Sequence, residues 1–244
     1  MRRDVKILLG TLALGPVLVW GPEVSQAVSQ MDTFRISDVE VRGIRFLSED
    51  AVVEQLELGA FASVWGDRDA WRERLVEHPM VRDAEIRRRL PNGLRVTIEE
   101  RRPIALAATP TLEPIDGEGY RLPIDPVRYS LDLPILTTGK LPPAGSYVFP
   151  REARDLAAEL EYLAASDEEF VRRISTVGRH TGGGLVVSLT APKVDLLVLP
   201  GTPLARLRQA EAAMADAMSK SGRVPAVIDI RFKDQVVVRH ARDD

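Results

Sequence analysis

The feature that most constrains the fold is a pair of alternating segments on either side of a short turn, within residues 81–100. Pro91-Asn92-Gly93 separates the two segments, and Asn and Gly tolerate the positive φ of a tight turn. Apolar side chains recur with a period of two before and after this turn: Ala84, Ile86, Leu90, Leu94, Val96 and Ile98. This period is typical of a half-buried strand, so the sequence predicts an antiparallel hairpin with one face on a core.

Charged side chains occupy the opposite face of the predicted hairpin. Arg87 and Arg89 project from it beside Glu85, and the returning strand adds Arg95 and Glu99. Cross-strand ion pairs are the structural explanation, and each exposed pair contributes at most about 1 kcal/mol. The alternative is a protein-contact surface, for which Arg87 and Arg89 are the candidate residues.

Before the hairpin, the pattern indicates one strand followed by two helices. Val39 and Val41 alternate with charged residues, which predicts a half-buried strand. Capping residues and apolar spacing then predict two helices. They are expected to start at Ser48 and at Asp67 or Asp69, and to end near Gly59 and Pro79. The expected order is β-α-α-β-β, over residues 34–106.

Residues 107–240 have a different sequence pattern, with short strand-like runs and two longer helical segments. Residues 152–165 and 203–220 repeat apolar side chains at helical spacing. The strand-like runs are residues 133–139, 174–180, 184–191, 193–201 and 226–240. The runs from 174 to 201 are expected to form an antiparallel meander. The sequence therefore predicts an α+β protein whose second domain is a mixed, mainly antiparallel β domain with two helices.

The amino terminus carries the one targeting signal. Residues 1–6 contain three basic side chains, and residues 7–22 contain no charge. This run is shorter than the roughly 20 residues of a typical membrane-spanning helix, and it includes Pro16. Trp20 suits an uncleaved membrane anchor, whereas Ala27-Val28-Ser29 would suit a cleaved signal peptide. We predict a cytoplasmic stub over residues 1–6 and a transmembrane signal anchor over residues 7–22, and cleavage stays the alternative.

Composition and motifs argue against several classes of function. The 33 basic and 36 acidic side chains leave a formal charge of -3, which disfavours a nucleic-acid partner. Cysteine is absent, so thiolate metal sites and cysteine nucleophiles are excluded. The three histidines, His78, His180 and His240, share no ligand spacing. We therefore predict no catalytic residue, no metal site, no cofactor and no small-molecule substrate.

Two motifs could have a catalytic or metal-binding role, but we favour their interpretation as turns or strand connections. His180 precedes a glycine run like that of some oxyanion loops, but the chain has no G-x-S-x-G turn, so a strand connection is the better interpretation. Asp116, Glu118 and Asp125 could bind a hard cation, yet their spacing is not that of a calcium loop. We interpret the Asp116-Gly117-Glu118-Gly119 segment as turns.

The order of these motifs resembles one protein family. VEVRGIRFLSEDAVVEQL, followed by DRDAWRERLVEHPMVRDAEIRRRLPNGLRVTIEERRPIAL, is similar to the POTRA domain of the FtsQ/DivIB bacterial cell-division proteins. The matching positions are Pro79, Val81, Ala84, Pro91, Leu94, Ile98, Glu100 and Pro103. The segments around residues 184–201, 203–218 and 227–239 resemble that family's β domain. Met80 replaces a common aromatic residue, and a tryptophan usual after the hairpin is missing.

The resemblance implies a function that composition and spacing do not show. It implies a noncatalytic scaffold of the divisome, held in the bacterial inner membrane by a single span with its amino terminus in the cytoplasm. The exported domains would recruit division proteins of the FtsB/DivIC and FtsL type that regulate septal peptidoglycan synthesis. The alternative is a POTRA-containing outer-membrane assembly or secretion factor, although the chain has one POTRA-like unit and no room for a barrel.

The closing strand is the predicted partner site. If residues 226–240 form a strand at a sheet edge, its unpaired backbone groups can accept a partner strand. The candidate residues are Arg231, Phe232, Lys233, Asp234, Gln235, Val237 and Arg239. Two alternatives stay open: the strand is central, or Lys233-Asp234 turns the chain back on itself. Val39, Val41, Arg87 and Arg89 are secondary contact candidates in the first domain.

Overall fold

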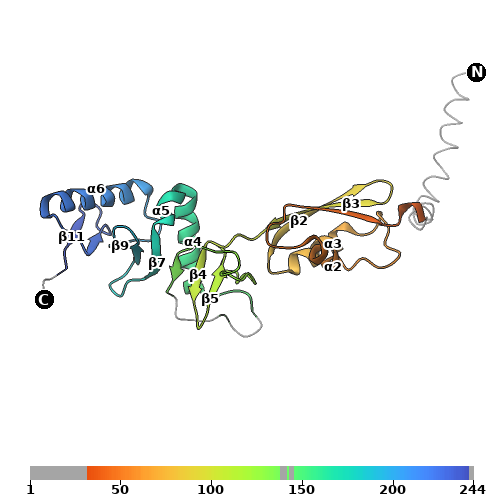
Figure 1. The fold of residues 1–244 in the computed structure, drawn as a ribbon, viewed down its shortest axis with the longest axis horizontal. Helices are drawn as coiled ribbons and strands as arrows, with labels where there is room; N and C mark the ends of the chain where they lie inside the picture. Colours follow the sequence, from red (N-terminus) through yellow and green to blue (C-terminus); the bar gives the residue numbers. More distant parts are fainter. Residues whose placement is uncertain (1–31, 138–141, 143–145, 242–244) are drawn as a thin grey trace, which may run out of the picture. The chain divides into compact units, whose positions relative to one another are not determined.

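The computed structural model describes residues 32–137, 142 and 146–241, which divide into two compact units between Glu100 and Arg101 (Figure 1). The sequence placed this boundary between residues 106 and 107. It lies earlier because Ala105–Ala108 forms β4, which pairs with two strands of the second sheet. The predicted stub and anchor, residues 1–6 and 7–22, lie outside the described residues. Within the described residues, no helix combines the length and the apolar character that crossing a membrane requires.

The first unit has the predicted β-α-α-β-β order, preceded by a short 3-10 helix. Its elements are η1 (Asp32–Phe34), β1 (Asp38–Arg42), α2 (Glu49–Gln55), α3 (Arg68–Glu77), β2 (Val81–Arg89) and β3 (Gly93–Glu100). The strands form a sheet of order β1-β3-β2, in which β1 is parallel to β3 and β2 is antiparallel to it. The predicted hairpin is confirmed, and β1 adds to the returning strand of that hairpin.

Local chemistry explains where the two helices begin. The Ser48 hydroxyl accepts a hydrogen bond from the Ala51 amide at 3.2 Å, as expected of an N-cap residue. Asp67, rather than Asp69, caps α3, because its carboxylate accepts from the amides of Asp69 and Ala70. Both caps satisfy amides that have no partner inside the helix.

The core of the first unit lies between the two helices and one face of the sheet. Its fully buried members include Leu56, Leu75, Leu94 and Val96. The hairpin residues alternate as predicted, with one exception. Leu90 is 61% exposed, because β2 ends at Arg89 and Leu90 belongs to the turn.

The second unit is built on one eight-stranded mixed sheet. Its strands are β4 (Ala105–Ala108), β5 (Leu112–Ile115), β6 (Ile135–Leu136), β7 (Ile174–Arg179), β8 (Leu185–Leu189), β9 (Asp195–Val198), β10 (Val227–Asp229) and β11 (Val237–Arg239). The order across the sheet is β11-β10-β9-β8-β7-β6-β4-β5. The meander β7-β8-β9 is antiparallel, as predicted, whereas β4-β6, β6-β7 and β9-β10 are parallel.

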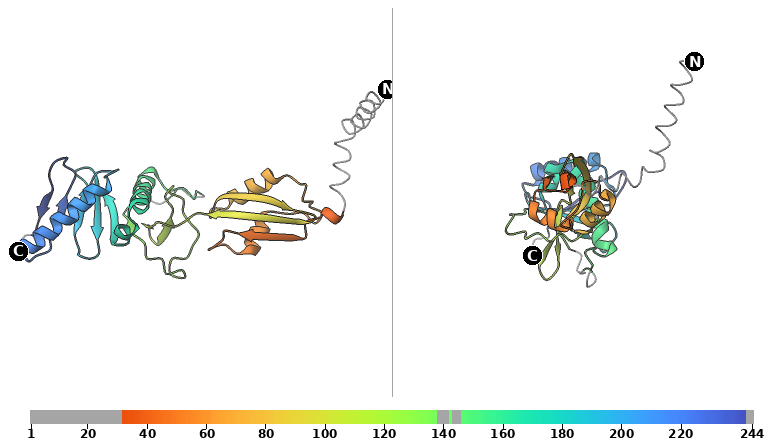
Figure 2. Two further views of the ribbon diagram at one scale, coloured as in Figure 1. Left: turned by 90° about the horizontal axis from the view of Figure 1, so that it is seen from above. Right: turned by 90° about the vertical axis from the view of Figure 1, so that its right-hand side faces the viewer.

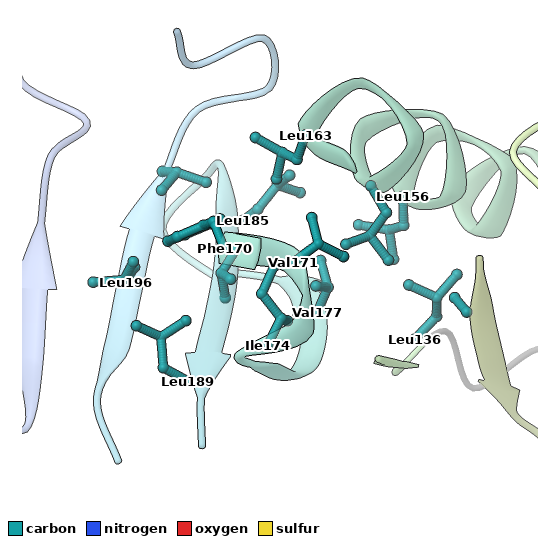
Figure 3. Close-up of a cluster of buried hydrophobic side chains, with 14 of the residues drawn as sticks. Leu136, Leu156, Leu163, Phe170, Val171, Ile174, Val177, Leu185, Leu189 and Leu196 are labelled. Carbon is teal, nitrogen blue, oxygen red and sulfur yellow. The ribbon is translucent and has the colours of Figure 1, made fainter. Parts of the chain in front are cut away.

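Among the described residues of this unit, three helices rather than the predicted two accompany the sheet: α4 (Arg151–Ser166), α5 (Glu168–Arg172) and α6 (Leu204–Ser221). The sequence missed α5, a single turn that follows α4 directly. Asp167 ends α4 and caps α5, because its carboxylate accepts from the Phe170 amide at 3.0 Å. Figure 3 shows side chains of α4 and α5, among them Leu156, Leu163 and Phe170, meeting side chains of the sheet.

The predicted single strand over residues 226–240 is wrong. The segment forms two short antiparallel strands, β10 and β11, with a turn between them. The alternative in which Lys233-Asp234 turns the chain back is the one that the structure contains. The connection from β9 to β10 runs through α6, which is the usual kind of crossover between neighbouring parallel strands. The fold is therefore α+β, with a β-α-α-β-β first unit and a mixed second sheet.

Candidate protein-docking edge

The candidate site is the hairpin of β10 and β11 at one end of the second sheet. β11 pairs with β10 through the register Val227↔Arg239, Ile228↔Val238 and Asp229↔Val237. In the part of the chain that the structure describes, no strand pairs with the other side of β11. A strand at such an edge presents backbone amides and carbonyls to which an extended peptide can hydrogen-bond.

The opposite edge of this sheet is covered by the chain itself. β5 forms a bridge between Ile115 and Arg121, and the Leu122 amide donates to the Pro114 carbonyl at 2.9 Å. Pro114 also lacks a backbone donor within β5. The two edges therefore differ: β5 is obstructed, and β11 is open within the described residues.

A buried carboxylate organises the open edge. Asp229 in β10 is only 2% exposed, and it pairs with guanidinium groups on both sides of the turn. Arg231 donates through Nε at 2.9 Å and through Nη2 at 2.7 Å, and Arg239 Nη2 lies 3.5 Å from Asp229 Oδ2. The hydrogen bonds from Arg231 lower the pKa of Asp229, against the opposing effect of burial. The carboxylate is therefore ionised at neutral pH and holds β10 and β11 together.

Arg231 also connects the hairpin to the turn between β7 and β8. Its Nη1 donates to the carbonyls of Gly182 and Gly183 at 3.1 and 2.7 Å, and lies 3.2 Å from His180 Nδ1. The Arg231 side chain is 17% exposed, and its hydrogen bonds with Asp229 raise its pKa. The glycine run after His180 is thus a strand connection, and its carbonyls hold an arginine.

Arg206 is a residue of this site that sequence reasoning missed. From the first turn of α6 it donates to the carbonyls of Ile230, Phe232 and Gln235 at 3.3, 2.5 and 2.8 Å. Figure 2 shows α6, the long blue helix, crossing the sheet beside these strands. Nothing in the local sequence around Arg206 indicates this role, because its partners lie up to 29 positions away.

The predicted partner-binding residues fall into three environments. Phe232, Lys233, Asp234 and Gln235 form the exposed turn, and Phe232 is 45% exposed. Val237 and Arg239 lie in β11. Arg231 is engaged by Asp229 and the glycine carbonyls, so its guanidinium acts within the protein. The turn and β11 are therefore the parts of the predicted set that are most accessible.

The secondary candidates lie on the sheet of the first unit. Val41 is buried and Val39 packs against the same core, so their side chains face inward. On the outer face, Arg89 pairs with Asp38 and Glu40 at 3.1 and 3.0 Å.

The two arginines that precede Arg89 have different partners. Arg87 pairs with Glu85 at 2.7 Å on the outer face. Arg88 lies on the other side, where it donates to the Val64 and Gly66 carbonyls. The consecutive arginines Arg87, Arg88 and Arg89 are therefore divided between two faces and do not form one cluster.

The residues considered for chemistry are held in structural roles. Asp116 Oδ1 accepts from the amides of Glu118 and Tyr120, which forms the predicted turn, and Asp116 Oδ2 pairs with buried Arg101 at 2.7 Å. Burial lowers the pKa of His78, whose Nδ1 accepts from the Met80 amide. Across the described residues, no group of three or more His, Asp or Glu side chains is arranged to hold a metal ion.

Comparison with known proteins identifies the first unit. Residues 34–101 match the model of the POTRA domain, FtsQ-type. The chain is 32% identical over 140 residues to the cell division protein FtsQ of Myxococcus fulvus. The first unit is thus similar to an FtsQ-type POTRA domain, and the chain resembles cell division proteins named FtsQ. It is also 28% identical over 219 residues to the cell division protein FtsQ of Rhodothermus marinus, and 22% identical over 245 residues to that of Geotalea daltonii.

The extent of these matches differs among the relatives. The Myxococcus alignment covers 55% of this chain and 48% of that relative, so the chain spans about half of its length. The Rhodothermus and Geotalea alignments cover 86% and 98% of this chain, and 79% and 88% of those relatives. The FtsQ likeness therefore extends beyond the POTRA domain into the second unit.

Proposed function

We propose that this protein is a noncatalytic scaffold of the bacterial divisome that recruits other division proteins through the open edge of its second sheet. The observation that carries the proposal is the position of β11, at the sheet edge that the chain leaves unpaired within the described residues. Similarity to the FtsQ-type POTRA domain and to cell division proteins named FtsQ supports the cell-division context. The partners we propose are proteins of the FtsB/DivIC and FtsL type.

The physical basis of recruitment is strand addition. A partner segment in extended conformation would hydrogen-bond to the backbone of β11, and its side chains would contact those of Val237, Arg239 and the turn. Asp229, Arg231 and Arg206 fix the hairpin before the partner arrives. A preformed edge lowers the entropy lost on binding, because the strand needs no further ordering.

We also propose that residues 7–22 anchor the protein in the inner membrane, with residues 1–6 in the cytoplasm and both folded units outside it. The basic flank followed by an uncharged run in the sequence supports this topology. The anchor would concentrate β11 at the membrane where septal peptidoglycan is made. An outer-membrane assembly role has no specific support in the structure.

Depletion of the protein in its host tests the cell-division role. We expect depleted cells to elongate without septa, with an intact outer membrane, when they are followed by microscopy. Normal division with a loss of envelope proteins would contradict the proposal and favour an assembly factor.

Truncation then tests the edge. A chain ending at Val236 lacks β11, whereas a chain ending at Ala241 keeps it, so the second is the matched control. The control chain should restore division in depleted cells and the shorter chain should not, provided that circular dichroism shows both to be folded. Division restored equally by both chains would exclude β11 as the docking strand.

A further inference from the structure

One end of the POTRA domain exposes apolar side chains that the core does not require. Phe61 is 79% exposed, Leu90 is 61% exposed and Trp65 is 44% exposed. Phe61 and Trp65 belong to the loop between α2 and α3, and Leu90 belongs to the turn between β2 and β3. We call this set, Phe61, Trp65 and Leu90, the apolar pole.

Backbone hydrogen bonds bring these loops to the same end of the domain. The Val64 amide donates to the Phe34 carbonyl at 2.9 Å, and the Ile36 amide donates to the Ala62 carbonyl at 2.8 Å. The Ser37 amide donates to the Asn92 carbonyl at 3.0 Å, which joins the hairpin turn to the start of β1. Figures 1 and 2 show η1 and the β2-β3 turn at this end of the first sheet.

Arginine side chains flank the apolar pole. Arg35 Cζ lies 4.8 Å from the centre of the Phe61 ring, and Arg88 Cζ lies 5.4 Å from the centre of the Trp65 ring. Burial and the neighbouring charge of Arg68 lower the pKa of Arg88, so the guanidinium groups of Arg68 and Arg88 are close enough to repel each other. Asp32 pairs with Arg35, and Asp67 is engaged as the cap of α3. Arg88 donates to the Val64 and Gly66 carbonyls, so the exposed Arg68 beside it is the cation that suits an anionic group.

The chain enters the POTRA domain at this same end. The described residues begin at Asp32, within η1, and Phe34 packs edge-on against Trp65 with a centroid distance of 5.9 Å. If residues 7–22 span the membrane, the ten Cα–Cα steps from residue 22 to residue 32 reach at most about 35 Å. The apolar pole then lies at the membrane-facing end of the domain.

We propose that the apolar pole rests in the headgroup layer of the membrane and sets the orientation of the POTRA domain on the bilayer. Exposed Trp and Phe side chains favour the membrane-water interface, where the ring is shielded and the edge stays hydrated. Neighbouring arginines interact with lipid phosphates at the same depth. The inference rests on the anchored topology proposed above, and it adds a contact between lipid and the folded domain.

The absence of cysteine permits a direct test on the full chain in vesicles. Gly59 lies in the same loop as Phe61, and a Cβ added there meets no atom within 4 Å, so Gly59→Cys can carry a fluorescent label. Glu77→Cys places the same label at the far end of α3. β2, which runs between the two ends of the domain, spans roughly 27 Å at strand spacing, so the two labels report different depths.

The readout is quenching by a nitroxide attached to the lipid headgroup, in vesicles of phosphatidylcholine and phosphatidylglycerol. We expect the label at residue 59 to lose its fluorescence and the label at residue 77 to keep it. The double variant Phe61→Ser/Trp65→Ser should remove the quenching at residue 59. The matched control is Val53→Ser/Val76→Ser, which changes exposed apolar residues on the two helices and should leave the quenching intact.

The outcomes separate this inference from the function proposed above. If the chain stays with the vesicles after a salt wash but neither label is quenched, another protein or another part of this chain covers the apolar pole, and the inference is overturned alone. Equal quenching at both positions would also overturn it, because the domain would then have no fixed orientation. A chain that leaves the vesicles would contradict the anchor and the inference together.

Discussion

Asp229→Asn is the substitution that most clearly tests how the docking edge is held. Asparagine keeps the size of the side chain and removes the charge that Arg231 and Arg239 share. Breaking a buried ion pair costs about 3–5 kcal/mol. Asp229 is 2% exposed, but the side chains of Arg231 and Arg239 are 17% and 56% exposed and can turn toward water. We therefore expect a loss of about 2–3 kcal/mol from the free energy of unfolding of the second unit.

The chain contains a built-in control for this measurement. All three tryptophans, Trp20, Trp65 and Trp71, precede residue 101, so tryptophan fluorescence reports the first unit, whereas circular dichroism reports both. With a urea m-value of about 2 kcal/mol/M, the dichroism midpoint of the second unit should fall by about 1 M. The tryptophan transition should stay where it is.

Two further comparisons sharpen the test. Asp234→Asn removes an exposed carboxylate from the turn of the same hairpin, and it should leave both transitions unchanged. The pKa of Asp229 is lower in the folded protein than in the unfolded chain, mainly through its hydrogen bonds with Arg231. Its contribution is therefore present above about pH 4 and decreases as the pH falls below that value. Equal effects of the two substitutions at neutral pH would refute this account of the hairpin.

Three other predictions concern single positions. Gly43→Ala should lower the free energy of unfolding of the first unit by about 2 kcal/mol, because Gly43 has φ 82° and an added Cβ would lie 2.1 Å from a carbonyl oxygen. The control is Gly59→Ala, where an added Cβ meets no atom within 4 Å. The assay is urea denaturation followed by tryptophan fluorescence. Burial lowers the pKa of His78, so the unfolded chain binds a proton at this side chain more readily than the folded protein does. The same assay should therefore show that the first unit loses stability as the pH falls through about 6.5. The His78→Gln variant should show a smaller loss over the same pH range. Arg206→Met should cost the second unit about 1–2 kcal/mol by circular dichroism, since three carbonyls lose a charged donor, whereas Arg208→Met should cost nothing measurable.

The sequence predicted the first unit well because its information is local. A period of two, a Pro-Asn-Gly turn and two capped helices each identify an element within a few residues. Gly43 marked the end of the first strand for a physical reason, since only glycine fits against the neighbouring strand there. What the local pattern could not provide was the parallel pairing of β1 with β3, which depends on the path of the chain through both helices.

The closing hairpin shows why the candidate site was only partly predictable. The alternation of apolar residues continues through Phe232, so it favoured one long strand, although Phe232 is half exposed in a turn. The turn is fixed by Arg206 from α6 and by Asp229 with its arginines. Such contacts join distant segments and leave no spacing signal. The edge position of β11 likewise follows from the sheet order, which the sequence does not specify.

The central claim is that β11 is the strand that docks a division protein. A photo-crosslinking amino acid at Arg239, in β11, and at Leu112, in the covered strand β5, would compare the two edges of the same sheet in living cells. The account predicts a crosslink from position 239 to a protein of the FtsB/DivIC or FtsL type, and none from position 112. Crosslinks to that protein from position 112 alone, or from neither edge, would contradict it.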